Sequence, residues 1–157
     1  MANKVLLNNE FYNKIALKSQ FDFSNATGQI ISDIIKISNL EFKVDLFYPR
    51  LFGSFMRYRK SLAYITSSYP NTLFLNARKL NRALAEIAAT ISHESIHALD
   101  DSENIYSFGH GNNSPVDKDN TEPYWIGNLA YSILTGHTVD SHLVFDQPEK
   151  DDGSEIA

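Results

Sequence analysis

The feature that most limits how this chain can fold is the long segment RKLNRALAEIAATISHESIHALDD at residues 78–101, which contains neither Gly nor Pro. Leu80, Leu84, Ile87 and Ile91 recur in it at helical spacing and form one apolar stripe. The segment therefore predicts a helix over 78–101. A helix with one apolar stripe needs another layer of the protein to cover that stripe.

The segments before this helix predict one shorter helix and a small sheet. FSNATGQIISDIIKISNL predicts a helix near 25–39, with Ser24 or Asn25 as its N-cap. EFKVDLFY, SLAYITSS and NTLFLNA predict three strands, and YPN predicts the turn between the second and the third. NTLFLNA is a candidate edge strand for pairing with an extended peptide, or else an interior strand. In the first strand we expect one buried face, made of Phe42, Val44, Leu46 and Tyr48.

The segments after the long helix predict a polar loop, a further helix and a tail. FGHGNNSPVDKDN is rich in Gly, Asn, Asp and Ser and predicts the loop. EPYWIGNLAYSIL predicts a helix that starts at Glu122 or Pro123. The last residues, DQPEKDDGSEIA, are acidic and predict a solvated tail. We therefore expect one α+β domain over 1–145, in which a small β-sheet packs on the long helix with helices on either side, and a flexible tail over 146–157.

Composition narrows the functions that are open to the chain. It has no cysteine, so a metal would have to be held by His, Asp or Glu. A net charge of −5 does not favour nucleic acid as the partner. The sequence shows no signal peptide and no apolar run long enough to span a membrane. We expect a cytoplasmic protein, or one that is exported by a route that needs no such signal.

The long helix carries the pattern H-E-x-x-H at His93, Glu94 and His97. Residues four apart lie one turn apart on one face of a helix, so both imidazoles can reach one metal ion. Glu94 is displaced by about 100° from His93 and can take a proton from a water molecule at the metal. The preceding turn holds Ala89 and Thr90, which are small enough to let another layer or a substrate approach. The alternative is a polar helix face with two surface histidines.

A catalytic zinc site usually has three protein ligands, so a third must be found. His110 lies in the glycine-rich loop and could fold back onto the metal. Glu122 opens the next helix and would complete a His-His-Glu set. Asp100 lies on the same helix as the two histidines and fits a supporting role better. The residue pattern leaves His110 and Glu122 open.

Four further residues are weaker candidates. Tyr106 and Tyr124 flank the expected site in sequence and could donate a hydrogen bond to an oxyanion, or could simply be packing aromatics. His137 and His142 could act from the far side of a cleft, although ordinary surface histidines are the simpler interpretation.

The segment HESIHALDDSENIYSFGHG resembles the metal-binding segment of SprT/Spartan-like zincin metallopeptidases. It is also similar to zinc-peptidase domains of bacterial effectors and toxins. The resemblance implies a zincin-like fold, His93, His97 and His110 as the Zn²⁺ ligands, and Glu94 as the catalytic base. The stretch NNSPVDKDN and the lack of a cysteine zinc ribbon depart from the SprT pattern, so a function on DNA is not expected.

These observations predict a zinc metallopeptidase that hydrolyses peptide bonds by a metal-activated water, with Glu94 as general base, as in an effector or toxin domain. Its partners would be a peptide or protein substrate and an inhibitor or immunity protein. Two other functions use the same residues. One is a zinc-binding interaction domain without peptidase activity, and the other is a zinc amidase that acts on cell-wall peptide.

Overall fold

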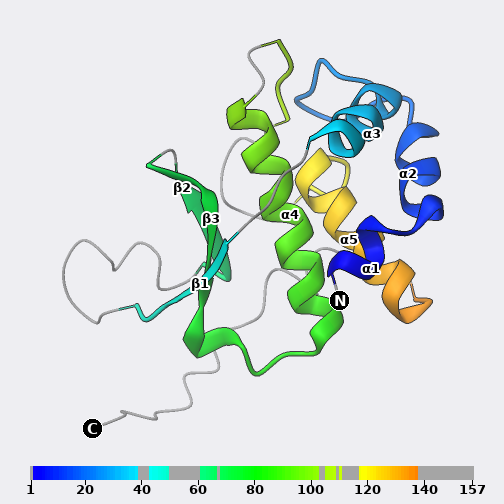
Figure 1. Ribbon diagram of the computed structural model, residues 1–157. Coiled ribbons are helices and arrows are strands. Elements are labelled where there is room, and N and C mark those ends of the chain that lie inside the picture. Colours follow the sequence, from blue (N-terminus) through cyan, green and yellow to red (C-terminus); the bar gives the residue numbers. More distant parts are fainter. Residues whose placement is uncertain are drawn as a thin grey trace, which may run out of the picture.

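The structure, a computed structural model, describes residues 2–38, 43–49, 61–66, 68–102, 105–108, 110 and 117–137. In this part of the chain a long helix, α4 (Leu84–Ser102), lies between a small sheet on one side and a group of helices on the other (Figure 1). The predicted α+β class is therefore confirmed. The end of the expected domain at residue 145 and the tail over 146–157 lie outside the described residues.

The start of α4 at Leu84 is later than predicted, because two local hydrogen bonds organise the residues before it. Asn76 Oδ1 accepts the N–H of Arg78 at 3.0 Å and opens a short 3-10 helix, η2 (Ala77–Lys79). The Glu86 carboxylate accepts the N–H of Ala83 at 3.1 Å. A carboxylate in the first helical turn that returns to the N-cap N–H is one half of a capping box, and it fixes the first turn here.

The sheet has three described strands, β1 (Lys43–Phe47), β2 (Ala63–Thr66) and β3 (Tyr69–Asn76), in the order β1-β3-β2. β1 runs parallel to β3, and β2 runs antiparallel to it. The NTLFLNA stretch is therefore the interior strand. The predicted turn at 69–71 is wrong, because Tyr69 already pairs with Thr66 and YPN forms the start of β3.

One face of the sheet packs on α4 through the predicted apolar stripe. Ala63, Leu73 and Leu75 form a buried cluster, and Leu80, Ile87 and Ile91 pack against it. Leu84 does not share this contact, since its side chain is 62% exposed at the first residue of the helix.

The predicted burial of one face of β1 is wrong. Val44 and Leu46 pair with Leu73 and Leu75 and share their face, yet they are 47% and 50% exposed. The reason lies in the packing of α4, which contacts β2 and β3. Tyr48, just beyond the strand, is also exposed, and Phe42 lies outside the described residues.

The first part of the chain forms three helices, α1 (Ala2–Leu6), α2 (Asn9–Ala16) and α3 (Gly28–Ile37). The N-cap of α3 is Thr27, whose hydroxyl accepts the N–H of Ile30 at 3.4 Å. The predicted N-caps are therefore wrong. Ser24 accepts the N–H of Ala26 instead, and Asn25 bonds to a distant part of the chain.

The last described helix, α5 (Glu122–Thr135), begins where the sequence predicts and packs along α4. Its first turn contains Pro123, which suits that position because no helical N–H partner is needed there. It ends at Gly136, which adopts a left-handed conformation with φ of 75°. Between α4 and the helices lies the main core, made of Val5, Phe11, Ile15, Phe21, Ala26, Ile31, Ile96, Leu99, Phe108, Ile126, Leu129 and Ala130.

None of the helices in the described part of the chain combines the length and the apolar character that crossing a membrane requires.

The close packing of α3 against α2 predicts that Gly28→Ala will strongly destabilise the protein. A Cβ at this position would lie 2.0 Å from the Ile15 carbonyl oxygen and 2.4 Å from that of Lys18. Both are backbone atoms that cannot rotate away, so we expect a loss of about 3 kcal/mol or more in the free energy of unfolding.

Urea unfolding of the Gly28→Ala variant measures this loss, and Gly136→Ala is the matched control. A Cβ at Gly136 meets nothing within 4 Å, so only its left-handed backbone opposes the change, at a cost of about 1–2 kcal/mol. Equal losses in the two variants would contradict the steric explanation.

Candidate metal centre

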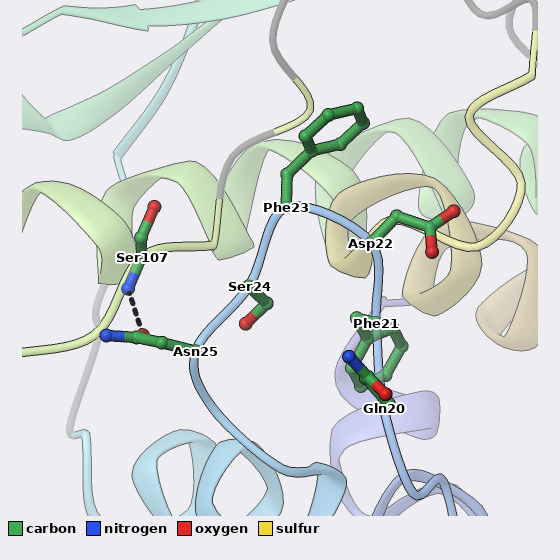
Figure 2. Close-up of a pocket in the computed structure, with 7 residues that line it drawn as sticks. All are labelled: Gln20, Phe21, Asp22, Phe23, Ser24, Asn25 and Ser107. Atoms are coloured by element: carbon green, nitrogen blue, oxygen red, sulfur yellow. Dashed lines mark hydrogen bonds between the residues drawn. The ribbon is translucent and has the colours of Figure 1, made fainter.

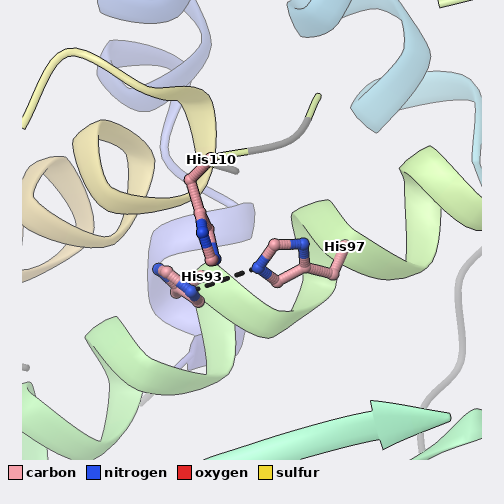
Figure 3. Close-up of side chains that lie close together, drawn as sticks. All are labelled: His93, His97 and His110. Atoms are coloured by element: carbon pink, nitrogen blue, oxygen red, sulfur yellow. Dashed lines mark hydrogen bonds between the residues drawn. The ribbon is translucent and has the colours of Figure 1, made fainter. Parts of the chain in front are cut away.

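Three histidines from two segments meet beside α4 (Figure 3). His93 and His97 come from successive turns of the helix, and His110 reaches them from the chain between α4 and α5. Their ligand atoms all lie within 4.8 Å of one another. Within the described residues, these three form the group of His, Asp and Glu side chains that could hold a metal ion.

The spacing of the first two imidazoles suits a tetrahedral metal site. Nε2 of His93 and Nε2 of His97 are 3.3 Å apart. Two nitrogens bound tetrahedrally to zinc at about 2.0–2.1 Å would lie about 3.3 Å from each other. The same separation also allows an N–H···N hydrogen bond between neutral imidazoles, so the pair can exist with or without an ion.

The start of α5 forms the wall behind the histidines. The buried ring of Tyr124 lies 4.5 Å from the ring of His93 and 5.1 Å from that of His110, measured between centroids. His93 also has a hydrogen bond with the backbone of Pro123, which must be to the carbonyl because proline has no N–H.

The two helical histidines are held in the neutral form. Burial is the main cause that lowers the pKa of His93 well below its ordinary value, followed by the charges of His97 and His110. The bond to Pro123 acts in the opposite direction. Burial, and then the charge of His110, lower the pKa of His97 to about 4. At neutral pH both imidazoles therefore have an unprotonated nitrogen, as metal binding requires.

Glu94 is the acidic residue of the site that the sequence predicts. It follows His93 directly on α4, and the helical angle of about 100° per residue turns it toward the side on which the sheet packs. Its side chain is half-buried, and burial raises the pKa of its carboxyl to about 8. A group whose pKa lies near neutrality exchanges protons readily at physiological pH.

The other sequence candidates lie elsewhere. Glu122 is fully buried as the first residue of α5 but is not part of the histidine group. Tyr106 is half-buried and stacks on Phe108 in the main core. Of the two roles that the sequence left open for it, this is that of a packing aromatic. His137 is exposed beyond the end of α5. The side chain of Asp100 and the whole of His142 lie outside the described residues.

Tyr124, which the sequence offers as an oxyanion donor or a packing aromatic, contacts two of the histidines with its ring. This contact depends on how α5 packs on α4. The role of Asn25 had no signal in the sequence. Asn25 reaches the chain before His110 from more than 80 positions earlier, as its hydrogen bond to Ser107 shows. Sequence patterns report on neighbours within a few residues, so contacts of this range could not be found from them.

Comparison with known proteins assigns no family to this chain. No family model matches it, and neither the curated proteins nor the solved structures gave a significant match. Function must therefore be argued from the site itself.

The shifted pKa of His97 predicts that acid will destabilise the metal-free protein. Its pKa is 6.5 in an ordinary environment and about 4 in the folded chain. Between these values the unfolded chain binds a proton that the folded chain does not. The free energy of unfolding should therefore fall as the pH drops from about 6.5 to about 4, with no further loss from this residue below that range.

Urea unfolding in the presence of a chelator, at about pH 7 and about pH 4.5, measures the effect. The His97→Asn variant should lose less stability between the two pH values than the wild type. His137→Asn, the same change at an exposed position, should behave like the wild type. If His97→Asn loses as much as the wild type, burial of this histidine does not control the acid response.

The histidine group also predicts which third residue matters for metal affinity. His110→Ala should weaken the binding of Zn²⁺ by more than about 100-fold, which exceeds the typical loss for a supporting residue. Glu122→Gln, which keeps the size of the buried side chain, should change it by less than about threefold. Titration against a chromogenic chelator measures both, and the reverse order would make Glu122 the ligand.

Proposed function

We propose that this protein is a zinc-dependent metallopeptidase with a zincin-like domain, in which His93, His97 and His110 bind Zn²⁺ and Glu94 is the general base. The observation that carries the proposal is the group of three histidines, two of which lie on α4 on either side of Glu94 in the sequence, with the half-buried Glu94 carboxyl on the same helix. A purely structural metal site has no use for such a group, and it normally closes all four positions with protein ligands.

The donor set supports zinc as the metal. Imidazole nitrogens suit Zn, Cu, Fe and Ni, and the chain offers no thiolate because it has no cysteine. Three histidines that leave one position open are a known catalytic zinc set. The spacing of 3.3 Å between the nitrogens of His93 and His97 is what such a set needs.

In this mechanism a bound Zn²⁺ supplies a Lewis acid that polarises the scissile carbonyl and acidifies the attacking water. A nearby cation favours the charged form of a carboxyl, so Glu94 is expected to be ionised in the loaded protein, despite the raised pKa that burial gives it. Glu94 accepts the proton of the water as it attacks, and donates it to the leaving amine. The contacts of Tyr124 with the rings of His93 and His110 keep these rings oriented.

The sheet offers a place for the substrate backbone. Because β3 is the interior strand, the edges among the described strands are β1 and β2. An extended peptide that pairs with one of these edges would gain backbone hydrogen bonds in a way that depends little on its sequence. Glu94 is turned toward the side of α4 on which the sheet packs. A peptide paired with an edge of the sheet would therefore lie on the same side of α4 as Glu94.

The decisive variant is Glu94→Gln, which removes the base but keeps the size of the side chain. We expect at least a 100-fold loss of cleavage, because general bases contribute about 10²–10⁴-fold, while zinc content stays unchanged. Substrates should include denatured proteins, peptide libraries and cell-wall peptides, so that an amidase would also be detected. Metal content is measured by elemental analysis and cleavage by mass spectrometry.

Glu86→Gln is the matched control on the same helix, since a glutamine there can still accept the N–H of Ala83. It should cleave like the wild type. The proposal fails if the wild type binds no zinc tightly, or if Glu94→Gln cleaves as fast as the wild type. A Glu94→Gln variant that still performs the protein's role in cells would favour an interaction domain.

A further inference from the structure

His110 differs from the other two histidines in how its position is fixed. His93 and His97 are spaced by the regular geometry of α4, whereas His110 and the described residues 105–108 before it form neither helix nor strand. Phe108, two residues earlier, is 1% exposed and belongs to the main core. Something must also fix the direction of the backbone that leads to Phe108 and His110.

The Asn25 side chain binds this backbone with both of its polar atoms. Its amide nitrogen donates to the Ile105 carbonyl at 3.0 Å, and its amide oxygen accepts the N–H of Ser107 at 2.9 Å. Figure 2 shows the second of these bonds. A neighbouring β-strand would offer the same donor and acceptor, so this side chain takes the place of a strand. It fixes the backbone on both sides of Tyr106, just before Phe108.

The same loop, residues 22–25, also binds the chain on the other side of His110. The backbone N–H of Asp22 donates to the Asn120 carbonyl at 3.1 Å, and the Asn120 side-chain amide donates to the Asp22 carboxylate at 2.8 Å. The Lys118 ammonium lies 4.5 Å from the centroid of the Phe23 ring. We call residues 22–25 the clamp loop, because they are bonded both before and after the histidine.

The clamp loop is itself anchored to the main core. Phe21 and Ala26, on its two sides, are 1% and 4% exposed, and the ring of Phe21 packs edge-on against Trp125 of α5. The loop lines an open hollow of about 620 Å³ together with Gln20, Phe21 and Ser107 (Figure 2). The clamp loop is therefore held in a fixed position relative to α5, the helix whose first turn packs against the histidines.

We propose that Asn25 is a positioning residue for His110: through its two hydrogen bonds to Ile105 and Ser107 it holds the third imidazole at the distance that metal binding requires. The inference rests on the proposed function, because it assigns Asn25 a role in metal affinity. Asn25 is not part of the histidine group. It acts only through the backbone that carries His110.

Asn25→Ala tests the proposal. Asn25 is exposed, so the substitution leaves no buried cavity and the variant should fold. We expect its affinity for Zn²⁺ to fall about tenfold, at the lower end of what residues that support metal ligands contribute. Asn25→Asp keeps the acceptor for Ser107 but loses the donor for Ile105. Its affinity for Zn²⁺ should therefore lie between that of the wild type and that of Asn25→Ala. The visible absorption of bound Co²⁺ should also weaken in Asn25→Ala as tetrahedral coordination is lost.

Two comparisons separate a positioning role from a general effect on stability. Asn8→Ala removes a half-buried asparagine, whose side chain accepts the N–H of Glu10 at 2.9 Å at the start of α2. It should lower stability and leave the affinity for Zn²⁺ unchanged. In a His110→Ala background, Asn25→Ala should have no further effect on the weaker binding by His93 and His97, because the ligand that it positions is absent.

The outcomes are distinct. A tenfold loss in the wild-type background that disappears with His110→Ala supports the role of Asn25. Equal affinity in the wild type and Asn25→Ala, or an equal loss with and without His110, overturns this inference and leaves the proposed function standing. Absence of tight zinc binding by the wild type itself overturns the proposed function, and the role of Asn25 with it.

Discussion

The site depends on placing three basic side chains together in a region that excludes water. Two imidazoles whose nitrogens are 3.3 Å apart cannot both be charged at such a location without a large electrostatic cost. Burial therefore removes the protons of His93 and His97 during folding. A metal ion bound by this group would meet nitrogens that are already unprotonated, so its binding would not have to displace protons from these two residues.

The helix α4 can hold the histidines in a buried position because its different sides pack against different parts of the protein. Ile87 and Ile91 face the sheet, and Ile96 and Leu99 face the helical core. His93 and His97 occupy the side between the helical core and Glu94, where α5 and His110 close over them. With both apolar sides packed, the helix cannot turn about its axis, and the direction of the histidines is fixed by residues that take no part in their chemistry.

Features set by local spacing were predictable from the sequence. The pairing of His93 with His97, the direction of Glu94 on α4 and the start of α5 all follow from helical geometry or from residues within one turn. The choice between His110 and Glu122 was not local, and the structure brings His110 into the group because the segment that carries it is bonded to the first part of the chain.

The predictions that were wrong also failed because of contacts between residues far apart in the sequence. Asn25 is a good N-cap residue by type, but its side chain is engaged by Ile105 and Ser107, and Thr27 caps α3 instead. The alternation in β1 suggested a buried face, but whether such a face is covered depends on where α4 packs. Propensity and periodicity describe what a segment can do, while a partner distant in sequence decides what it does.

The attachment of the clamp loop to the chain on both sides of His110 has a consequence for how the protein is made. The loop leaves the ribosome early, but its partners at Ile105, Ser107 and Asn120 are synthesised some 80 to 98 positions later. A nascent chain can pair His93 with His97 as soon as α4 forms, because that contact is local. The complete three-histidine group has to wait until α5 has emerged and docked. Binding of the proposed metal ion would thus be tied to the end of folding, and a chain released early would offer only the weaker two-histidine site.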